Sequence, residues 1–212
     1  SFLNRLLPYL APAEEAVGLY VFEGTLYGAR VVRQRTIKVV KTFTEPLTGG
    51  FEQAVQRLSL REKLSGLPVA VGVEGTEAIS RLVTLPGSEE ADEWLANNTD
   101  TFLPHGVKPA DVFYDFQIVS EVTGEKQLFV AAARQELLSI LKLAVENAGL
   151  LPCSIGLGMA ASLNVISPGD GLYGMLFLGE KESVVLIGEG KKVKAYKPIL
   201  AGKAQLIESP KF

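Results

Sequence analysis

The chain has 212 residues, of which 47% are hydrophobic and 21% charged, so it has ample apolar material for a globular core. A net charge of -3 and an isoelectric point near 5.4 argue against nucleic-acid binding. A single cysteine, Cys153, and a single histidine, His105, exclude a disulfide framework and a zinc site.

The first predicted element is a hairpin over residues 17–32. Apolar and β-favouring side chains flank a tight turn at Glu23 and Gly24. Residues 35–46 have the composition of a third strand. The three segments together predict an antiparallel meander.

A helix and a further strand follow the meander. Residues 49–66 predict a helix that is closed by Gly66, and residues 67–74 predict a short buried strand. One face of this helix collects Phe51, Ala54, Val55 and Leu58. Meander, helix and strand in this order form the first part of a ribonuclease H-like unit.

The next four segments predict a strand-helix-strand-strand unit. Residues 79–86 form its first strand, residues 88–104 a helix with Ser88 as N-cap, and residues 111–121 and 126–134 two more strands. The third segment places Val112, Tyr114, Phe116 and Ile118 on one face. We expect this unit to bind a partner, because a sheet covered by a helix on one face leaves its other face or its edge for a peptide.

The remaining sequence returns to helix and meander. Residues 135–150 predict a helix with Gly149 as its C-cap, followed by a strand over 154–157 and a small helix over 159–165. The apolar face of the first helix consists of Leu137, Leu138, Leu141, Ala144, Val145 and Ala148. Strands over 172–180, 182–190 and 192–202 make a second meander that echoes the first. The repetition indicates two related halves, the second of which stops early.

The sequence offers little support for a catalytic group. Cys153 lies in an apolar segment without a neighbouring base, so it is interpreted as a small buried hydrophobe, and His105 as an exposed loop residue. The glycines of segment 156–161 are followed by no phosphate-loop lysine, which favours a packing contact.

Charged residues are interpreted as solvated surface. The acidic pairs are Glu89 with Glu90 and Asp111 with Asp115; both fit solubility better than general acid-base catalysis. Lys191, Lys192 and Lys194 are taken as the only short basic cluster, on the solvated face of one strand. No run reaches the ~20 apolar residues of a membrane span and no secretory signal opens the sequence, so a cytoplasmic location is expected.

Several segments resemble the cytoplasmic actin-like proteins of type IV pilus and type II secretion inner-membrane platforms, the PilM and GspL kind. The resemblance lies in "AVGLYVFEGTLYGARVV", in "ISRLVTLP" before an acidic helix that ends in "FLP", in "DVFYDFQIV", in "LFVAAARQELLSILKLAVENAGLLPCSI" and in "LFLGEKESVVLI". It implies an α/β fold: an actin-like (ribonuclease H-like) domain with an inserted strand-helix-strand-strand subdomain and a partial second domain.

The resemblance also implies domain boundaries. Residues 1–13 form an N-terminal segment, residues 14–77 and 134–169 the actin-like first domain, residues 78–133 the inserted SHS2-like subdomain, and residues 170–212 the start of the second actin-like domain.

Members of this group that bind ATP carry aspartates and glycines at the phosphate loops, because Mg²⁺ needs carboxylates and phosphate needs unobstructed amides. Here Tyr20 and Phe177 stand at the two aspartate positions, Phe22 at a glycine and Glu23 at the turn. Tyr27 lies near the place of a lysine. The resemblance therefore implies degenerate phosphate loops, with no catalytic residue, cofactor or metal.

The expected function is that of a non-catalytic cytoplasmic scaffold, peripheral to the inner membrane through a partner. It would bind the cytoplasmic tail of an inner-membrane platform protein, with the motor ATPase and self-association as further partners. The alternative is a nucleotide-binding switch or ATPase of the actin and sugar-kinase superfamily. Residues 4–10, "NRLLPYL", resemble the Asn-Leu-Leu-Pro-Tyr tail by which the membrane partner docks in this group. They indicate either a groove-binding segment or an amphipathic helix with an apolar side.

Overall fold

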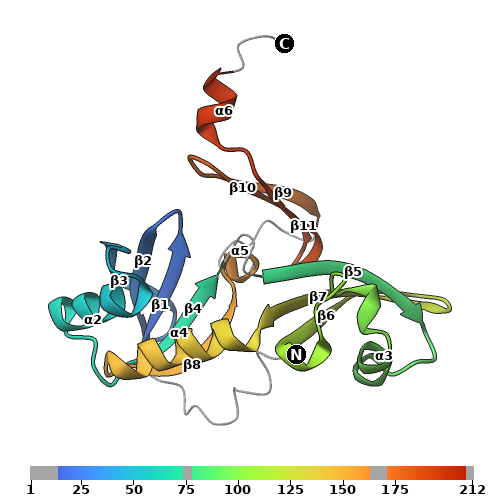
Figure 1. Ribbon diagram of the computed structural model, residues 1–212, viewed down its shortest axis with the longest axis horizontal. Coiled ribbons are helices and arrows are strands. Elements are labelled where there is room, and N and C mark those ends of the chain that lie inside the picture. Colours follow the sequence, from blue (N-terminus) through green and yellow to red (C-terminus); the bar gives the residue numbers. More distant parts are fainter. Residues whose placement is uncertain (1–13, 74–77, 163–170, 209–212) are drawn as a thin grey trace. The chain divides into compact units, whose positions relative to one another are not determined.

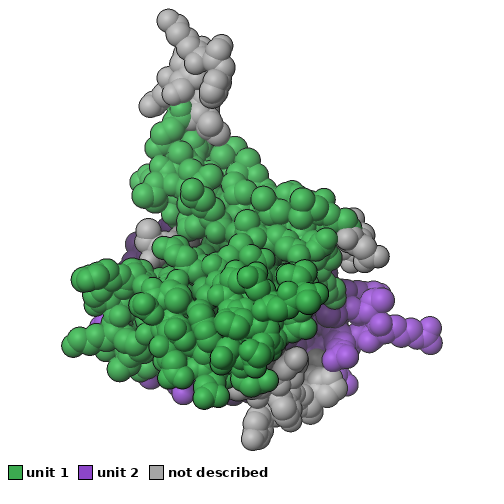
Figure 2. Space-filling model, turned by 90° about the vertical axis from the view of Figure 1, so that its right-hand side faces the viewer, with its two compact units in different colours: residues 1, 75–135, 159–212 green, residues 2–74, 136–158 purple. Residues whose placement is uncertain are grey.

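The described part of the chain forms three β-sheets and several helices, as Figure 1 shows for the computed structural model. The structure describes residues 14–73, 78–162 and 171–208, so the N-terminal segment 1–13 and part of the helix expected over 159–165 lie outside the described residues. The chain divides into two compact units, coloured separately in Figure 2. One contains residues 2–74 and 136–158, and the other contains residue 1, residues 75–135 and residues 159–212. The domain boundaries expected from the sequence stay predictions.

The first unit is built on a five-stranded sheet. Its strands are β1 (Glu15–Phe22), β2 (Thr25–Arg33), β3 (Ile37–Pro46), β4 (Pro68–Val73) and β8 (Leu151–Leu157). They lie in the order β3-β2-β1-β4-β8, with β1, β4 and β8 parallel and the other pairs antiparallel. The meander and the following parallel strands confirm the ribonuclease H-like order.

Two helices supply apolar side chains to the core on this sheet. They are α2 (Phe51–Glu62) and α4 (Gln135–Asn147). The predicted apolar faces of both helices are confirmed. The buried residues are Ala54, Val55 and Leu58 of α2 and Leu141, Ala144 and Val145 of α4. Strand residues such as Val17, Leu19, Leu26, Val69 and Val71 complete this core.

The end of α2 differs from the prediction. The helix ends at Glu62 and its C-cap is Lys63, in the left-handed region with φ 56°. The Leu64 N–H donates to Ser59 O at 3.0 Å, which satisfies a carbonyl of the last turn. Gly66 also has a positive φ but lies in the following turn, so the expected closure at this glycine is wrong by three residues.

The second unit contains the predicted strand-helix-strand-strand insert. Strands β5 (Ala78–Pro86), β6 (Val112–Val122) and β7 (Glu125–Arg134) form a sheet in the order β5-β7-β6. Helix α3 (Ala91–Asn97) contributes Ala91 and Leu95 to its core. Val112, Tyr114 and Phe116 face this core, as the alternation predicts. Ile118, the fourth residue of the predicted face, is 38% exposed and lies outside the core, because the register with β7 shifts between Ile118 and Ser120.

Helix α3 is shorter than the predicted 88–104. Its N-cap is Glu90 rather than Ser88, because the Glu89 N–H donates to Pro86 O at 3.0 Å and holds the preceding residues in a turn. At the other end, the Asn98 side-chain amide donates to Trp94 O at 2.8 Å and replaces the next helical hydrogen bond. Two 3₁₀ turns, Thr99–Thr101 and Pro109–Asp111, continue the chain.

The same unit holds the second meander. Strands β9 (Leu172–Leu178), β10 (Ser183–Glu189) and β11 (Lys192–Ile199) form a sheet in the order β11-β10-β9, and the short helices α5 (Gly158–Ser162) and α6 (Lys203–Glu208) flank it in sequence. Strand β11 lies against β6: Gln117 Nε2 donates to Lys191 O at 3.2 Å, and the Val193 N–H donates to Gln117 Oε1 at 3.2 Å. Phe129 of β7 packs on Tyr196 with ring centroids 6.0 Å apart.

The sheet face of the insert opposite α3 is therefore partly occupied by β11, and peptide binding at this face or at the edge of the sheet stays a prediction. Within the described ranges, no helix combines the length and the apolar character needed to cross a bilayer.

Candidate functional site

The candidate site is the β1–β2 hairpin, where an actin-like protein would hold phosphate. Phe22 pairs with Thr25 and Tyr20 pairs with Tyr27 across the two strands. The two turn residues have positive φ angles, 45° at Glu23 and 74° at Gly24, which is the conformation of a type I′ turn. The predicted hairpin and its tight turn are confirmed.

Three aromatic rings gather beside this turn. The ring of Tyr20 stacks on that of Phe22, with centroids 5.9 Å apart and planes at 9°, and lies 6.4 Å from the ring of Tyr27. The three residues share one sheet face, because Tyr20 and Phe22 are two positions apart and Tyr27 is the cross-strand partner of Tyr20. Phe22 is buried, Tyr20 half-buried and Tyr27 exposed.

A glycine of the neighbouring strand β4, Gly72, makes room for Tyr20. Gly72 is its partner on β4, and a Cβ atom at Gly72 would stand 3.1 Å from Tyr20 Cδ2 and 2.8 Å from Gly158 Cα. Gly158 thus makes a close backbone contact with β4. This arrangement agrees with the packing role inferred for the glycines of segment 156–161.

The other predicted site residues lie at separate places. Glu23 is exposed at the turn itself. Phe177 lies on β9 opposite Val184 and belongs to the other compact unit. A shared cleft lined by Tyr20 and Phe177 therefore stays a prediction.

Metal ligands are not clustered in the part of the chain that the structure describes, where no group of three or more His, Cys, Asp or Glu side chains could hold an ion. The Cys153 thiol donates to Val69 O at 3.0 Å, and burial raises its pKa. A raised pKa disfavours the thiolate, which is the nucleophilic form. Cys153 therefore lacks the environment of a reactive cysteine, and His105 lies in an exposed turn.

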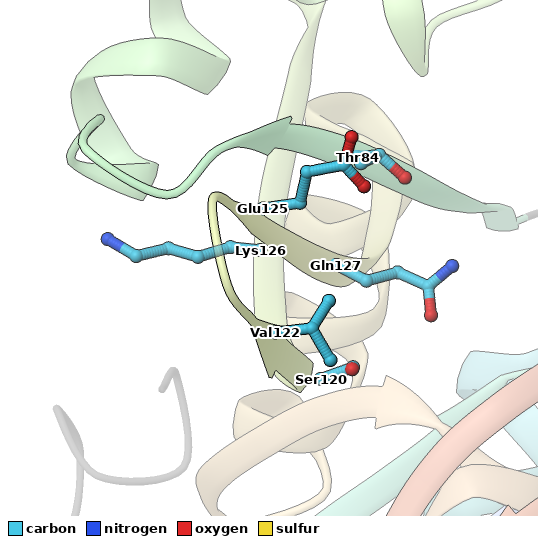
Figure 3. Close-up of a pocket in the computed structure, with 6 residues that line it drawn as sticks. All are labelled: Thr84, Ser120, Val122, Glu125, Lys126 and Gln127. Atoms are coloured by element: carbon cyan, nitrogen blue, oxygen red, sulfur yellow. The ribbon is translucent and has the colours of Figure 1, made fainter.

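A small polar pocket lies at the β6–β7 turn of the insert (Figure 3). Its volume is about 130 Å³, and its lining consists of Thr84, Ser120, Val122, Glu125, Lys126 and Gln127. Lys126 Nζ donates to Glu89 O at 2.9 Å, and Figure 3 shows the Lys126 and Gln127 side chains extending in opposite directions. The polar groups do not converge on a common point, so the pocket has no catalytic arrangement.

Sequence reasoning overlooked a larger basic cluster than Lys191, Lys192 and Lys194. Residues 30–41, "RVVRQRTIKVVK", contain five Lys or Arg side chains and no acidic one, spread over β2 and β3. The signal that could have identified this cluster is that every charged residue in the segment 30–41 is basic. It is easily overlooked, because uncharged residues separate the basic ones in the sequence. By contrast, Lys194 pairs with Glu189 at 2.8 Å.

The sheet order, the interrupted crossover from β4 to α4 and the second meander define an actin-like α/β fold with an inserted subdomain. The structure is similar to a chain of a "PilM-PilN type IV pilus biogenesis complex", with a TM-score of 0.75 and 19% identity over 91% of this chain and 63% of that chain. The chain thus spans less than two thirds of that protein's length.

Two further solved structures have related folds. One is the cytoplasmic domain of EpsL, an inner-membrane component of the type II secretion system of Vibrio cholerae (TM-score 0.64, 12% identity, 92% of this chain and 75% of that chain). The other is a Bacteroides thetaiotaomicron protein with an actin-like ATPase fold (TM-score 0.52, 5% identity, 92% and 73%). No protein-family model and no curated protein matches the sequence. The actin-like fold expected from the resemblance to PilM and GspL is confirmed.

Proposed function

We propose that the chain is a non-catalytic cytoplasmic scaffold of a type IV pilus or type II secretion platform, which binds the cytoplasmic tail of an inner-membrane protein. The observation that carries this proposal is the stack of Tyr20 on Phe22 at the hairpin of an actin-like fold. The names of two similar structures, a PilM-PilN complex and an inner-membrane secretion component, support the assignment to such a platform.

The aromatic hairpin disfavours nucleotide chemistry for two physical reasons. Mg²⁺ takes oxygen ligands, and an aromatic ring at Tyr20 or Phe22 brings no carboxylate. A phosphate can approach backbone amides only where side chains are small, and the buried ring of Phe22 stands beside the turn.

We place the partner-binding surface on the insert, at the β6 edge of its sheet rather than on the sheet face that β11 partly covers. Among the described residues, strand β6 pairs with β7 on one side and with no strand on the other, and Phe113 of β6 is 55% exposed. An edge strand can accept a peptide as an additional strand, and an exposed aromatic side chain can anchor it. The motor ATPase and a second copy of the chain stay predicted partners.

Nucleotide binding is tested by thermal unfolding with and without Mg-ATP. A ligand at 100 times its Kd stabilises the native state by about 2.7 kcal/mol, so millimolar ATP detects even weak binding. We expect no shift in melting temperature and no phosphate release. A clear shift that disappears on substituting hairpin residues would favour the nucleotide-switch alternative.

Partner binding is tested by fluorescence anisotropy with a labelled peptide that carries Asn-Leu-Leu-Pro-Tyr. We expect saturable binding, weakened at least tenfold by Phe113→Asp. The matched control is Leu60→Asp, which places the same charge at an 81% exposed leucine on α2 and should leave the affinity unchanged. Equal affinity of the two variants would exclude the β6 edge as the binding site.

A further inference from the structure

The β2–β3 hairpin concentrates positive charge in a chain that is acidic as a whole. Its residues 30–41 carry five basic side chains and no acidic one, whereas the net charge of the chain is -3. Two of the five are paired: Arg30 with Glu15, and Lys41 with Glu62. Within the described ranges, the side chains of Arg33, Arg35 and Lys38 form no ion pair or hydrogen bond. Three cations are therefore available around the hairpin turn.

Aliphatic side chains are exposed beside these cations. Ile37 is 73%, Val39 62% and Val40 54% exposed on β3. Such β-branched residues ordinarily pack in a sheet interior, and their exposure next to one another forms an apolar patch. Lys38 lies between Ile37 and Val39 in sequence, so charge and apolar surface occupy the same strand.

Strand addition fits this edge poorly. Strand β3 is an outer strand of its sheet, as Figure 1 shows, but its register with β2 shifts at Val40, which lies between the paired residues Val39 and Lys41. A bulge interrupts the regular row of backbone groups that an added strand needs. An acidic peptide would neutralise the cations but would pair badly with the irregular edge.

A second observation favours binding of a lipid surface over addition of a single peptide strand. The Arg33 N–H donates to Glu14 O at 2.7 Å, so the chain enters β1 directly beside the hairpin turn. The sequence before this entry point, residues 1–12, contains Arg5 and no acidic residue. It also contains the large apolar residues Phe2, Leu3, Leu6, Leu7 and Leu10. A lipid surface can accept the basic and the apolar side chains of the hairpin together, whereas an added strand uses the backbone groups of one edge.

We propose that the β2–β3 hairpin binds a bilayer surface that contains anionic lipids. Arg33, Arg35 and Lys38 contact the headgroups, and Ile37 and Val39 enter the interface. Basic side chains near an anionic surface and apolar side chains within it add to each other in such contacts. The inference does not depend on the proposed function, and it adds a direct membrane contact to the one expected through a partner.

The test is cosedimentation of the full chain with phosphatidylcholine vesicles that contain or lack phosphatidylglycerol. We expect binding only to the anionic vesicles, decreasing at high salt. The triple variant Arg33→Gln, Arg35→Gln, Lys38→Gln should reduce partitioning by about fivefold per residue, hence about a hundredfold in total. The charge-matched control Lys191→Gln, Lys192→Gln, Lys197→Gln removes three exposed lysines of the other unit and should change binding by only a few-fold.

The apolar contribution is measured separately. In a Cys153→Ser background, Ile37→Cys labelled with a polarity-sensitive dye should shift its emission to the blue on anionic vesicles. Thermal unfolding checks that each variant is folded. Equal effects of the two triple variants, or equal binding to neutral vesicles, would overturn the proposal. It would also be overturned if deletion of residues 1–13 abolished binding while the hairpin variant retained it.

Discussion

The ring of Phe43 on β3 lies over Gly28, its partner on β2, so closely that a Cβ atom at Gly28 would stand 1.9 Å from Phe43 Cε2. Phe43 is buried in the core of the first unit, so its ring cannot move away freely. We expect Gly28→Ala to lower the free energy of unfolding by about 1–3 kcal/mol through overpacking. Urea denaturation measures the change.

The control for this prediction is Gly18→Ala on the neighbouring strand β1. In the part of the chain that the structure describes, nothing lies within 4 Å of the added Cβ there. Removing a flexible glycine from a strand should leave stability unchanged or raise it slightly. Equal losses in the two variants would show that the Phe43 contact is not the cause.

Glu45 joins β3 to α2. Arg57 Nε donates to Glu45 Oε1 at 2.7 Å and Arg61 Nη1 donates to Oε2, while Arg57 Nη2 also donates to Pro46 O at 3.0 Å. The Glu45 side chain is buried, and a glutamine there would keep one acceptor oxygen but turn an NH2 group towards the second guanidinium and remove the negative charge. Glu45→Gln should destabilise the fold by about 1–3 kcal/mol at pH 7, measured by urea denaturation.

The stability that depends on Glu45 should vanish in acid. Hydrogen bonds from Arg57 and Arg61 hold the pKa of this carboxyl below its ordinary value of 4.5. The unfolded state therefore binds a proton more readily than the folded state. The contribution is complete above about pH 5 and is lost as the pH falls through the lowered folded pKa.

This dependence is checked by comparing the wild type with Glu45→Gln from pH 7 to pH 3. The difference in unfolding free energy between them should shrink towards the acid end. Glu146→Gln, which removes an exposed pair with Lys142, should give a small difference throughout. A difference in unfolding free energy between the wild type and Glu45→Gln that stays constant with pH would contradict the prediction.

An aspartate at Tyr20 should restore no ATP turnover, since the neighbouring ring of Phe22 remains in place. Tyr20→Asp also exchanges a stacked ring for a carboxylate in a half-buried position, which should cost about 1–3 kcal/mol of stability. Phosphate release and urea denaturation measure the two effects. Tyr27→Ser, at the exposed member of the same cluster, should cost much less. ATPase activity in Tyr20→Asp would show that the hairpin still supports nucleotide chemistry.

Local periodicity predicted the presence of the strands and the buried faces of α2 and α4, although the alternation in β6 fails at Ile118. The alternation of Val112, Tyr114 and Phe116 identifies the core side of β6, and the spacing of Leu141, Ala144 and Val145 identifies that of α4. Both follow from short-range geometry, because side chains alternate in a strand and recur every three to four residues in a helix.

The ends of the helices and the contacts between strands were harder to predict from the sequence, because they depend on particular hydrogen bonds and strand pairings. The Asn98 side chain ends α3 early, and Lys63 takes the left-handed position that the sequence suggested for Gly66. The ring of Phe43 over Gly28 is invisible in sequence, since it requires the register of two strands. The sequence identified Tyr20, Phe22 and Tyr27 as aromatic residues at the phosphate-loop positions. That the rings of Tyr20 and Phe22 stack, with Tyr27 beside them, is seen only in the structure.

The pairing of Ala78 with Ala133 bears on how the chain folds. These residues lie opposite each other where β5 begins and β7 nears its end, so the insert starts and finishes at neighbouring points of one sheet. Once β5 and β7 have paired, the crossover from β4 to α4 is a short loop in entropic terms, however many residues the insert contains. A longer or shorter insert should therefore leave the assembly of the five-stranded sheet unslowed, provided that β5 and β7 still pair at its two ends.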